Sequence, residues 1–388
     1  MKALRRRTRL LAAVVAAPAA VLAGGTAILA SCGPFTDVTD GVFCPFVLEI
    51  FYLGITTGIN ATTYDPASPV SRLQMATFLS RTVDRLLQRG GRRASLNQFS
   101  APQGESLLAL TTVGSQPHLL RSDGTDVWVA NFGSASVSRV RASDGKVLET
   151  WTGAPSAAGV LVAMGRVLVT GFTLPGTPAN LFLIDPSAPA GAVTLVASNL
   201  ASGSVGIAFD GSRVWTAGVF QGVSIVTPGA SIPWTVTTAT TGFSQPQGLV
   251  FDGANVWTTD QNVSRLYRLD AAGAILQTVT VGMTPLYPAF DGANIWVPSQ
   301  VGQSVTVVRA STGAVLATLT GNGLAGPQSA AFDGQRVLIA CLGGLSVWKA
   351  ADLTPMGFVS MINNAYGSCS DGVNFWVTLN NTNRIARF

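Results

Sequence analysis

The sequence predicts a mainly all-β protein in which a seven-bladed β-propeller follows a small α-helical N-terminal module. The prediction rests on a strand-rich unit that recurs seven times after residue 105 and on two helical segments before residue 88. The composition agrees, because only 11% of the 388 residues are charged while 47% are hydrophobic. Disordered chains have high charge and low hydrophobicity, so this chain is expected to fold.

Residues 1–31 have the pattern of an export signal. Five of the 24 bases lie in the first ten residues, and residues 11–30 carry no charge. The same run is long enough to span a bilayer, so an uncleaved anchor is the alternative. Without this segment 19 bases face 19 acids, and no nucleic-acid partner is predicted from the basic pI. We expect an exported protein of the bacterial cell envelope, cell surface or extracellular space.

Four cysteines occur in the chain, at positions 32, 44, 341 and 369. An even number in an exported protein favours disulfides, with three possible pairings. Two of the possible pairs, Cys32–Cys44 and Cys341–Cys369, would each stay within one domain. The segment Leu29-Ala30-Ser31-Cys32 also resembles a bacterial lipobox, which implies lipidation of Cys32 as an alternative.

Residues 32–88 are expected to form a small helical module. A first helix is predicted over residues 45–53, and the sequence GITTGIN then interrupts it. A second helix begins at Ser71, because Ser71 and Gln74 have the spacing of a capping box. Its apolar face consists of Leu73, Ala76, Phe78, Leu79, Val83, Leu86 and Leu87.

This module resembles the S-layer homology (SLH) domain family in the order of its motifs. The family motif Thr-Arg-Ala-Glu reads Ser71-Arg72-Leu73-Gln74, in one copy rather than three. The resemblance implies noncovalent attachment to a cell-wall polymer, with Asp37, Arg72 and Gln74 as wall-binding candidates. Arg72 suits this role because a guanidinium can bind a carboxylated sugar through two hydrogen bonds. The other matching segments are Phe35-x-Asp37-Val38, Leu53-Gly54-Ile55-Thr56-x-Gly58 and Asp65-Pro66.

Residues 89–104 lack apolar periodicity, which predicts a linker, and a repeat occupies residues 105–388. Its unit is an apolar strand, the residues Phe-Asp-Gly, and a second strand that begins Val-Trp. Four short strands per unit of about 40 residues are the signature of a β-propeller. The aligned copies lie 38 to 47 residues apart, at Val127, Val167, Val214, Val256, Ile295, Val337 and Phe375.

The last unit has only three strand-like runs, and residues 106–113 are expected to supply the fourth strand and close the ring. Such a closure leaves no free sheet edge. The repeats resemble NHL and YVTN-type propellers over about residues 105–388, which implies the seven-bladed fold and no particular activity. The repeated Trp residues are predicted to pack between blades, and the repeated Asp residues to form tight turns with Gly.

The segments that open the innermost strands are expected to meet at the mouth of the central channel. No cofactor or metal is predicted, because the chain has a single histidine. Uncharged hydrogen-bonding side chains there predict contact with an unknown protein or small-molecule ligand. The candidates are His118, Gln247, Tyr287, Gln328 and Tyr366.

We favour a binding platform over an enzyme. Virginiamycin B lyase has a related propeller with a metal and a catalytic histidine, and this resemblance implies His118 as a general base. The predicted function is an exported envelope protein in which the SLH-like module positions a propeller that acts as a binding platform. The alternatives are a propeller-type lyase and a lipoprotein anchored through Cys32.

Overall fold

The chain divides into two compact units, residues 1–89 and residues 90–388. The computed structural model describes residues 32, 34–38, 43–52, 55–79, 82, 109–220, 222–361 and 364–388. The predicted export signal and linker therefore lie outside the described residues. Among the described residues, no helix is long and apolar enough to cross a membrane.

The N-terminal unit has a small core around one helix and one disulfide. Helix α2 covers Cys44–Tyr52, within one residue of the predicted bounds. Cys32 is bonded to Cys44, with their Cα atoms 5.5 Å apart, which confirms this predicted pairing. The buried ring of Phe35 packs edge-on against Phe51 at 5.0 Å. The core therefore joins the segment before α2 to the helix itself.

A second helix in this unit begins at residue 72 with the predicted capping box, and its described residues are 72–79 and 82. Gln74 Oε1 accepts a hydrogen bond from Ser71 N at 2.8 Å, and Ser71 Oγ accepts one from Gln74 N at 3.2 Å. Amphipathic helices normally pack their apolar face on a core. Here Leu73 is 82% exposed and Leu79 is 59% exposed. The hydrophobic core around α2 consists of residues between 32 and 64 and includes no described residue of the second helix.

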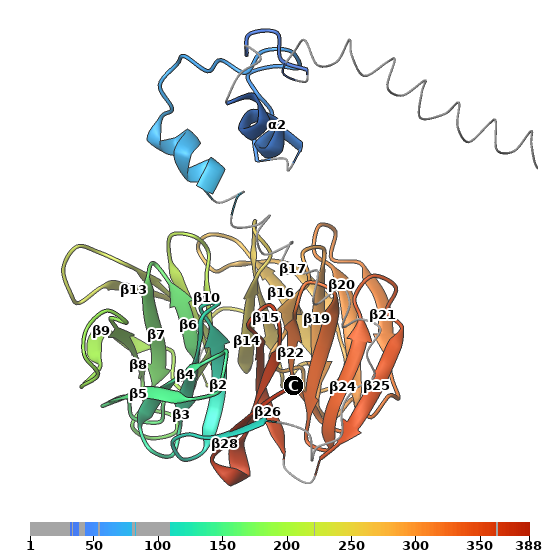
Figure 1. The fold of residues 1–388 in the computed structure, drawn as a ribbon. Helices are drawn as coiled ribbons and strands as arrows, with labels where there is room; N and C mark the ends of the chain where they lie inside the picture. The colour runs from blue at the N-terminus through green and yellow to red at the C-terminus, as the bar shows by residue number, and fades with distance from the viewer. Residues whose placement is uncertain are drawn as a thin grey trace, which may run out of the picture. The chain divides into compact units, whose positions relative to one another are not determined.

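Residues 109–388 fold into seven antiparallel four-stranded sheets, the blades of the predicted propeller (Figure 1). The chain runs outward through each blade from its innermost strand. In order, the strands are β2 Pro117–Ser122, β3 Asp126–Asn131, β4 Ser136–Arg141, β5 Val147–Thr152, β6 Val160–Ala163, β7 Arg166–Gly171, β8 Ala179–Ile184, β9 Thr194–Leu200, β10 Ser204–Phe209, β11 Val214–Gly218, β12 Gly222–Thr227, β13 Thr235–Ala239, β14 Pro246–Phe251, β15 Val256–Asp260, β16 Arg265–Leu269, β17 Ile275–Thr280, β18 Ala289–Phe290, β19 Asn294–Ser299, β20 Ser304–Arg309, β21 Val315–Leu319, β22 Pro327–Phe332, β23 Arg336–Cys341, β24 Gly344–Lys349, β25 Pro355–Ser360, β26 Ala365–Ser370, β27 Phe375–Leu379 and β28 Arg384–Arg387.

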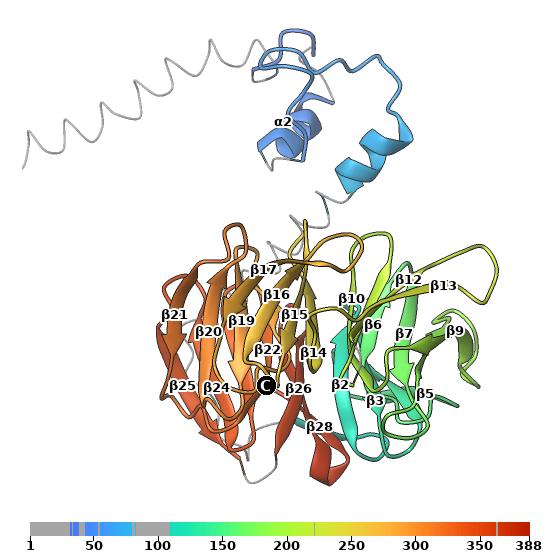
Figure 2. The ribbon, with the colours of Figure 1, turned by 180° about the vertical axis from the view of Figure 1, so that it is seen from behind.

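Strand β1, Ala109–Thr112, closes the ring. It pairs antiparallel with β28, so that the seventh blade has the order β1-β28-β27-β26. This pairing confirms the predicted fourth strand. Both views show β2 and β26 side by side, where the first and last blades meet (Figures 1 and 2).

Strand register defines two faces of the propeller. Pro117 at the start of β2 pairs with Asn131 at the end of β3, and the other blades repeat this pattern. All innermost strands therefore begin at one face, which we call the mouth face. The opposite face carries the Asp-Gly turns between the first two strands of each blade, and we call it the turn face.

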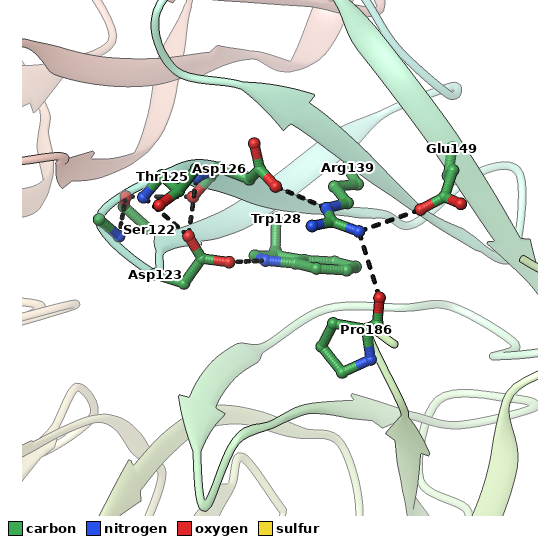
Figure 3. A network of polar contacts seen from close by, with 9 residues as sticks. Ser122, Asp123, Thr125, Asp126, Trp128, Arg139, Glu149 and Pro186 are labelled. Carbon is green, nitrogen blue, oxygen red and sulfur yellow. Dashed lines mark hydrogen bonds and ion pairs between the residues drawn. The ribbon is translucent and has the colours of Figure 1, made fainter. Parts of the chain in front are cut away.

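A polar network at the turn face supports the buried Trp of the first blade (Figure 3). Trp128 Nε1 donates to Asp123 Oδ2 at 2.9 Å, and the other carboxylate oxygen accepts bonds from Thr125 N and Asp126 N. The Arg139 guanidinium lies 5.2 Å from the centre of the Trp128 ring. Its Nε also donates to Asp126 Oδ2 at 2.6 Å. One carboxylate therefore both folds the turn and holds the indole.

The Asp–Trp bond recurs in four further blades with N–O distances of 2.7 to 2.8 Å. All five Trp side chains are at most 1% exposed, so their predicted packing between blades is confirmed. The bond to Asp was missed, although a constant spacing of five residues carried the signal. The pairs are Asp210–Trp215, Asp252–Trp257, Asp291–Trp296 and Asp371–Trp376.

Two blades depart from this arrangement. The second blade has Met164 in its turn and Leu168 in place of the Trp. In the sixth blade Leu338 replaces the Trp, and Asp333 forms an ion pair with Arg336 at 2.8 Å instead. Asp210 forms the same kind of ion pair with Arg213 while it also binds Trp215, so the sixth blade keeps the ion pair and lacks the indole.

The predicted pairing of Cys341 with Cys369 was wrong, because both are free and buried. Their positions along neighbouring blades explain this. Cys341 pairs with Pro327 at the mouth end of its blade, whereas Cys369 pairs with Trp376 near the turn end. Burial raises the pKa of each thiol to about 12.

Candidate functional site at the channel mouth

Four predicted mouth residues form one aromatic and polar cluster at the mouth face. His118, Gln247 and Tyr366 each lie second in an innermost strand, β2, β14 and β26. Tyr287 lies just before β18. These four residues, which we call the mouth cluster, come from four different blades.

His118 makes the aromatic contacts of the mouth cluster. Its ring centre lies 4.3 Å from that of Tyr366, 5.7 Å from that of Phe132 and 6.4 Å from that of Tyr287. Its Nδ1 lies 3.3 Å from Ala158 O. The tautomer that donates from Nδ1 to this carbonyl leaves Nε2 as a hydrogen-bond acceptor.

Gln247 and the two tyrosines form a chain of hydrogen bonds. Gln247 Nε2 donates to Tyr287 Oη at 3.0 Å, and the two tyrosine oxygens of Tyr287 and Tyr366 lie 3.1 Å apart. Gln247 Oε1 is buried and has no hydrogen-bond partner among the described residues. A buried acceptor without a donor is costly. This oxygen would gain a partner from a ligand donor that displaces the side chains covering it.

The neighbouring blade fixes the backbone of Tyr287. Tyr287 N donates to Gln328 O at 3.1 Å, and Ala330 N donates to Tyr287 O at 3.0 Å. Gln328, the fifth predicted mouth residue, thus acts through its backbone. Its side-chain amide donates to Gly326 O at 3.0 Å, so the structure places this side chain against its own blade rather than in the mouth cluster.

Burial keeps the mouth cluster uncharged at neutral pH. It lowers the pKa of His118 to about 4, and the contact with Ala158 O offsets only part of this effect. Burial also raises the pKa of Tyr287 well above its usual range, and it raises the pKa of Tyr366. The cluster therefore offers neutral donors, neutral acceptors and ring faces.

One charged side chain below the mouth cluster was missed. Arg121 of β2 lines a cavity of about 20 Å³ with Tyr287, Ser329 and Ser368, which is room for about one water molecule. Burial lowers the pKa of Arg121. Among the innermost strands, it is the one residue of the types Asp, Glu, Lys and Arg. Aligning the strand-opening segments over their full length would have revealed it.

The three wall-binding candidates share no contact with one another among the interactions of the described residues. The Asp37 carboxylate accepts hydrogen bonds from Tyr64 N at 2.9 Å and Asp65 N at 2.7 Å, which lower its pKa. Gln74 caps the second helix and lines a cavity of about 460 Å³ with Tyr64. Arg72 is exposed and, like Asp37, is not among the residues that line this cavity. Asp37 and Gln74 therefore both have structural contacts within the module.

Cys32, the lipidation candidate, is fully buried and its sulfur is bonded to Cys44. A lipid thioether would need the same sulfur, so the disulfide and lipidation exclude one another. Among the described residues, no group of three or more His, Cys, Asp or Glu side chains is placed to hold a metal ion.

Solved structures of propellers are similar to this chain over most of the propeller. A streptogramin B lyase superposes with a TM-score of 0.57 at 13% identity, over 74% of this chain and 99% of that chain. Virginiamycin B lyase from Staphylococcus aureus has a TM-score of 0.57 at 14% identity, over 72% and 98%. The WD40 β-propeller domain of Doa1 has a TM-score of 0.60 at 12% identity, over 74% and 97%.

These similarities establish the seven-bladed β-propeller fold. At such low identity they carry the fold and no activity. No protein-family model matches the sequence, and no curated protein matches it.

Proposed function

We propose that this is an exported protein of the bacterial cell envelope whose propeller binds an uncharged ligand or protein segment at the mouth cluster. The observation that carries the proposal is the buried, unpaired Oε1 of Gln247 beside two tyrosine hydroxyls. Binding sites typically combine apolar and aromatic walls with a few convergent polar groups. The mouth cluster has this composition.

The chemistry of the cluster selects the ligand. An N–H or O–H group of the ligand would donate to Gln247 Oε1, and an apolar or ring-shaped part would contact the His118 and Tyr366 rings. No carboxylate contacts the His118 ring among the described residues. A cationic ligand group would find no carboxylate there, and the cluster's own donors and acceptors are neutral, so binding favours neutral molecules.

Native mass spectrometry of the full chain tests this proposal. The protein is incubated with the neutral low-molecular-weight fraction of a bacterial envelope extract, and the mass of the complex is measured. We expect a bound species on the native protein that Gln247→Leu loses, because leucine has a similar size and no acceptor. Asp270→Ala, at an exposed turn of the opposite face, is the matched control. Equal binding by all three proteins would contradict the assignment.

We propose further that the N-terminal module positions the propeller at the cell wall. The support is the ordered set of SLH-like motifs and the capping box that begins the second helix. Arg72 is exposed at the first turn of this helix, where it can reach a carboxylated sugar.

Co-sedimentation of the full chain with purified cell-wall sacculi tests the positioning role. We expect Arg72→Ala to weaken sedimentation, while Arg384→Ala, which removes an exposed charge from the propeller, leaves it unchanged. If neither the native protein nor the control sediments with sacculi, the wall-binding proposal fails.

A lyase is the second candidate with weaker support. The contact of Nδ1 with Ala158 O leaves Nε2 as an acceptor, but burial lowers the pKa of His118 to about 4, which makes it a weak base, and no carboxylate contacts its ring among the described residues. The test is the turnover of virginiamycin B by the full chain, followed by mass spectrometry. Turnover that His118→Gln abolishes would establish the lyase, and an unchanged substrate would remove it.

A lipoprotein anchored through Cys32 is the remaining alternative for localisation. Its support is the sequence Leu29-Ala30-Ser31-Cys32, whereas the Cys32–Cys44 disulfide opposes it. Mass spectrometry of the mature N-terminus separates the two. We expect a cleaved chain without lipid and with a disulfide, and a diacylglyceryl adduct on Cys32 would overturn that expectation.

A further inference from the structure

The loops of the mouth face contain no charged residue. Two loops per blade reach this face, one that leads into the innermost strand and one that joins the second and third strands. Neither kind contains Asp, Glu, Lys or Arg in any blade. The described loop residues are 113–116, 132–135, 153–159, 172–178, 201–203, 219–220, 240–245, 261–264, 281–288, 300–303, 320–326, 342–343, 361, 364 and 380–383.

Large apolar side chains project from these loops into solvent. Six of them are between 36% and 61% exposed, and they come from loops of successive blades around the mouth cluster. We call these six residues the loop tips. They are Leu174, Phe220, Val263, Met283, Val301 and Leu342.

The turn face has the opposite character. Its loops carry acids in all seven blades, and bases such as Lys146 and Arg213 accompany them. Two exposed large apolar residues, Met164 and Ile232, lie in the described loops of this face. Exposed large apolar residues also lie on the outermost strands of several blades, so the loop tips are set apart by the absence of charge in the loops that carry them.

We propose that the mouth face docks onto the surface of a neutral lipid bilayer through the loop tips. A bilayer is a flat apolar partner that accepts separate side chains from several loops, provided that no charge must leave water. The cores of protein interfaces are instead continuous, and arginine and tyrosine are enriched in them. The loop tips are separated by Gly, Ser, Asn and Gln, which can hydrogen-bond at the level of the headgroups.

This inference uses the same face as the proposed ligand site but does not depend on the ligand. Gln247 belongs to the mouth cluster and is buried, whereas the loop tips are exposed. Gln247→Leu is therefore expected to abolish ligand binding and to leave bilayer docking unchanged. The two proposals can fail separately.

A fluorescent label at single introduced cysteines tests the docking in the full chain. The native cysteines do not compete, because Cys32 and Cys44 form a disulfide and the other two are buried with raised pKa values. Val263→Cys reports on the mouth face, and Met164→Cys, which replaces a side chain of similar exposure at the turn face, is the matched control.

Each labelled protein is mixed with phosphatidylcholine vesicles, with and without nitroxide-labelled lipid. We expect a severalfold rise in emission for Val263→Cys that nitroxide lipid quenches and high salt does not abolish, because no ion pair is involved. Met164→Cys is expected to show no rise. No response at the mouth face, or an equal response at both faces, would overturn the proposal. A rise that follows protein concentration without vesicles would also overturn it, in favour of pairing between two copies.

Discussion

The turn face and the mouth face of the propeller differ in the use of charge. At the turn face, Asp residues begin the tight turns of six blades, and five of them also bind the indole of a buried Trp. At the mouth face no loop carries a charge, and His118, Gln247 and the two tyrosines form a neutral cluster. The charges of this face lie at strand ends: Asp260 accepts hydrogen bonds from Ser244 N and Gln245 N, and Arg265 and Arg384 begin their strands there. The charges of the turn-face loops thus maintain the blades, whereas the loops and the cluster of the mouth face are uncharged.

Four arginines of the propeller have a structural role at the turn face. Four arginines lie over the ring of a repeat Trp, with distances of 5.2 to 5.7 Å to the ring centre. Such cation–π contacts stabilise the ring that packs between blades. These arginines, at positions 139, 213, 268 and 387, therefore belong to the structural frame of the turn face.

The largest expected effect is the loss of one turn aspartate. In Asp252→Ala the buried Trp257 loses its partner at 2.7 Å, and the turn loses its acceptor for Ala254 N and Asn255 N. We expect the free energy of unfolding to fall by about 4 kcal/mol, because charged hydrogen bonds and a buried unpaired donor are both costly. Chemical denaturation measures this change.

The matched control is Asp270→Ala, which removes a turn aspartate that accepts bonds from Ala272 N and Ala274 N but binds no Trp. Its expected cost is about 1 kcal/mol. Equal costs for the two variants would show that the Asp–Trp bond adds nothing to the turn.

The mouth face is expected to lose stability as the pH falls from 6.5 to 4. The pKa of His118 is lowered from 6.5 to about 4 in the folded chain, so the unfolded state binds the proton more tightly. The contribution of His118 to the free energy of unfolding is complete above pH 6.5, and about 3 kcal/mol of it is lost by pH 4. The free energy of unfolding is measured at several pH values in the native protein and in His118→Gln. The variant should not show this decrease between pH 6.5 and pH 4. An equal decrease in both proteins would show that groups other than His118 cause it.

The turn face is expected to respond in a lower pH window. Burial favours a raised pKa for Asp210, but hydrogen bonds from Trp215, Arg213 and Ser212 outweigh it and lower the pKa from 3.8 to about 2. The contribution of Asp210 is therefore present above pH 3.8 and is lost as the pH falls through 2, by about 2 kcal/mol. Asp210→Asn should remove this second loss and leave the His118 window unchanged. A shift of the upper window in Asp210→Asn would show that the two faces are coupled.

The smallest expected effect concerns the free cysteines at the two ends of neighbouring blades. A reductant should leave the unfolding midpoint of the propeller unchanged, because Cys341 and Cys369 form no bond. Alkylation followed by mass spectrometry should modify neither thiol in the folded protein and both after unfolding. If the reductant lowered the unfolding midpoint of the propeller, this would indicate that Cys341 and Cys369 do form a disulfide.

Much of the fold could be predicted because the repeat is a property of the sequence. The strands of the fourth blade, the closing β1 and the capping box at Ser71 all follow from local patterns that the structure confirms. The Cys341–Cys369 pairing failed for a different reason. It depends on how far along each strand the two residues lie, which a blade count does not reveal.

The sequence predicts where the candidate site lies, but it does not predict which side chains of the site contact one another. The strand-opening segments named His118, Gln247, Tyr287 and Tyr366, and the structure brings these four together. Gln328 shares the same strand position, but its amide turns to Gly326 O. Which rotamer a side chain adopts, and whether Gln247 Oε1 stays unpaired, depend on packing between blades that are distant in sequence.

Hydrogen–deuterium exchange of the full chain, with and without the neutral envelope fraction, compares the two faces most directly. We predict slower exchange at residues 113–119, 285–288 and 365–367 of the mouth face, because bound ligand hinders local opening there. The turn-face residues 252–255 and 371–374 should exchange at the same rate in both samples. Slower exchange confined to the turn face, or a bound mass without slower exchange at the mouth, would contradict the account.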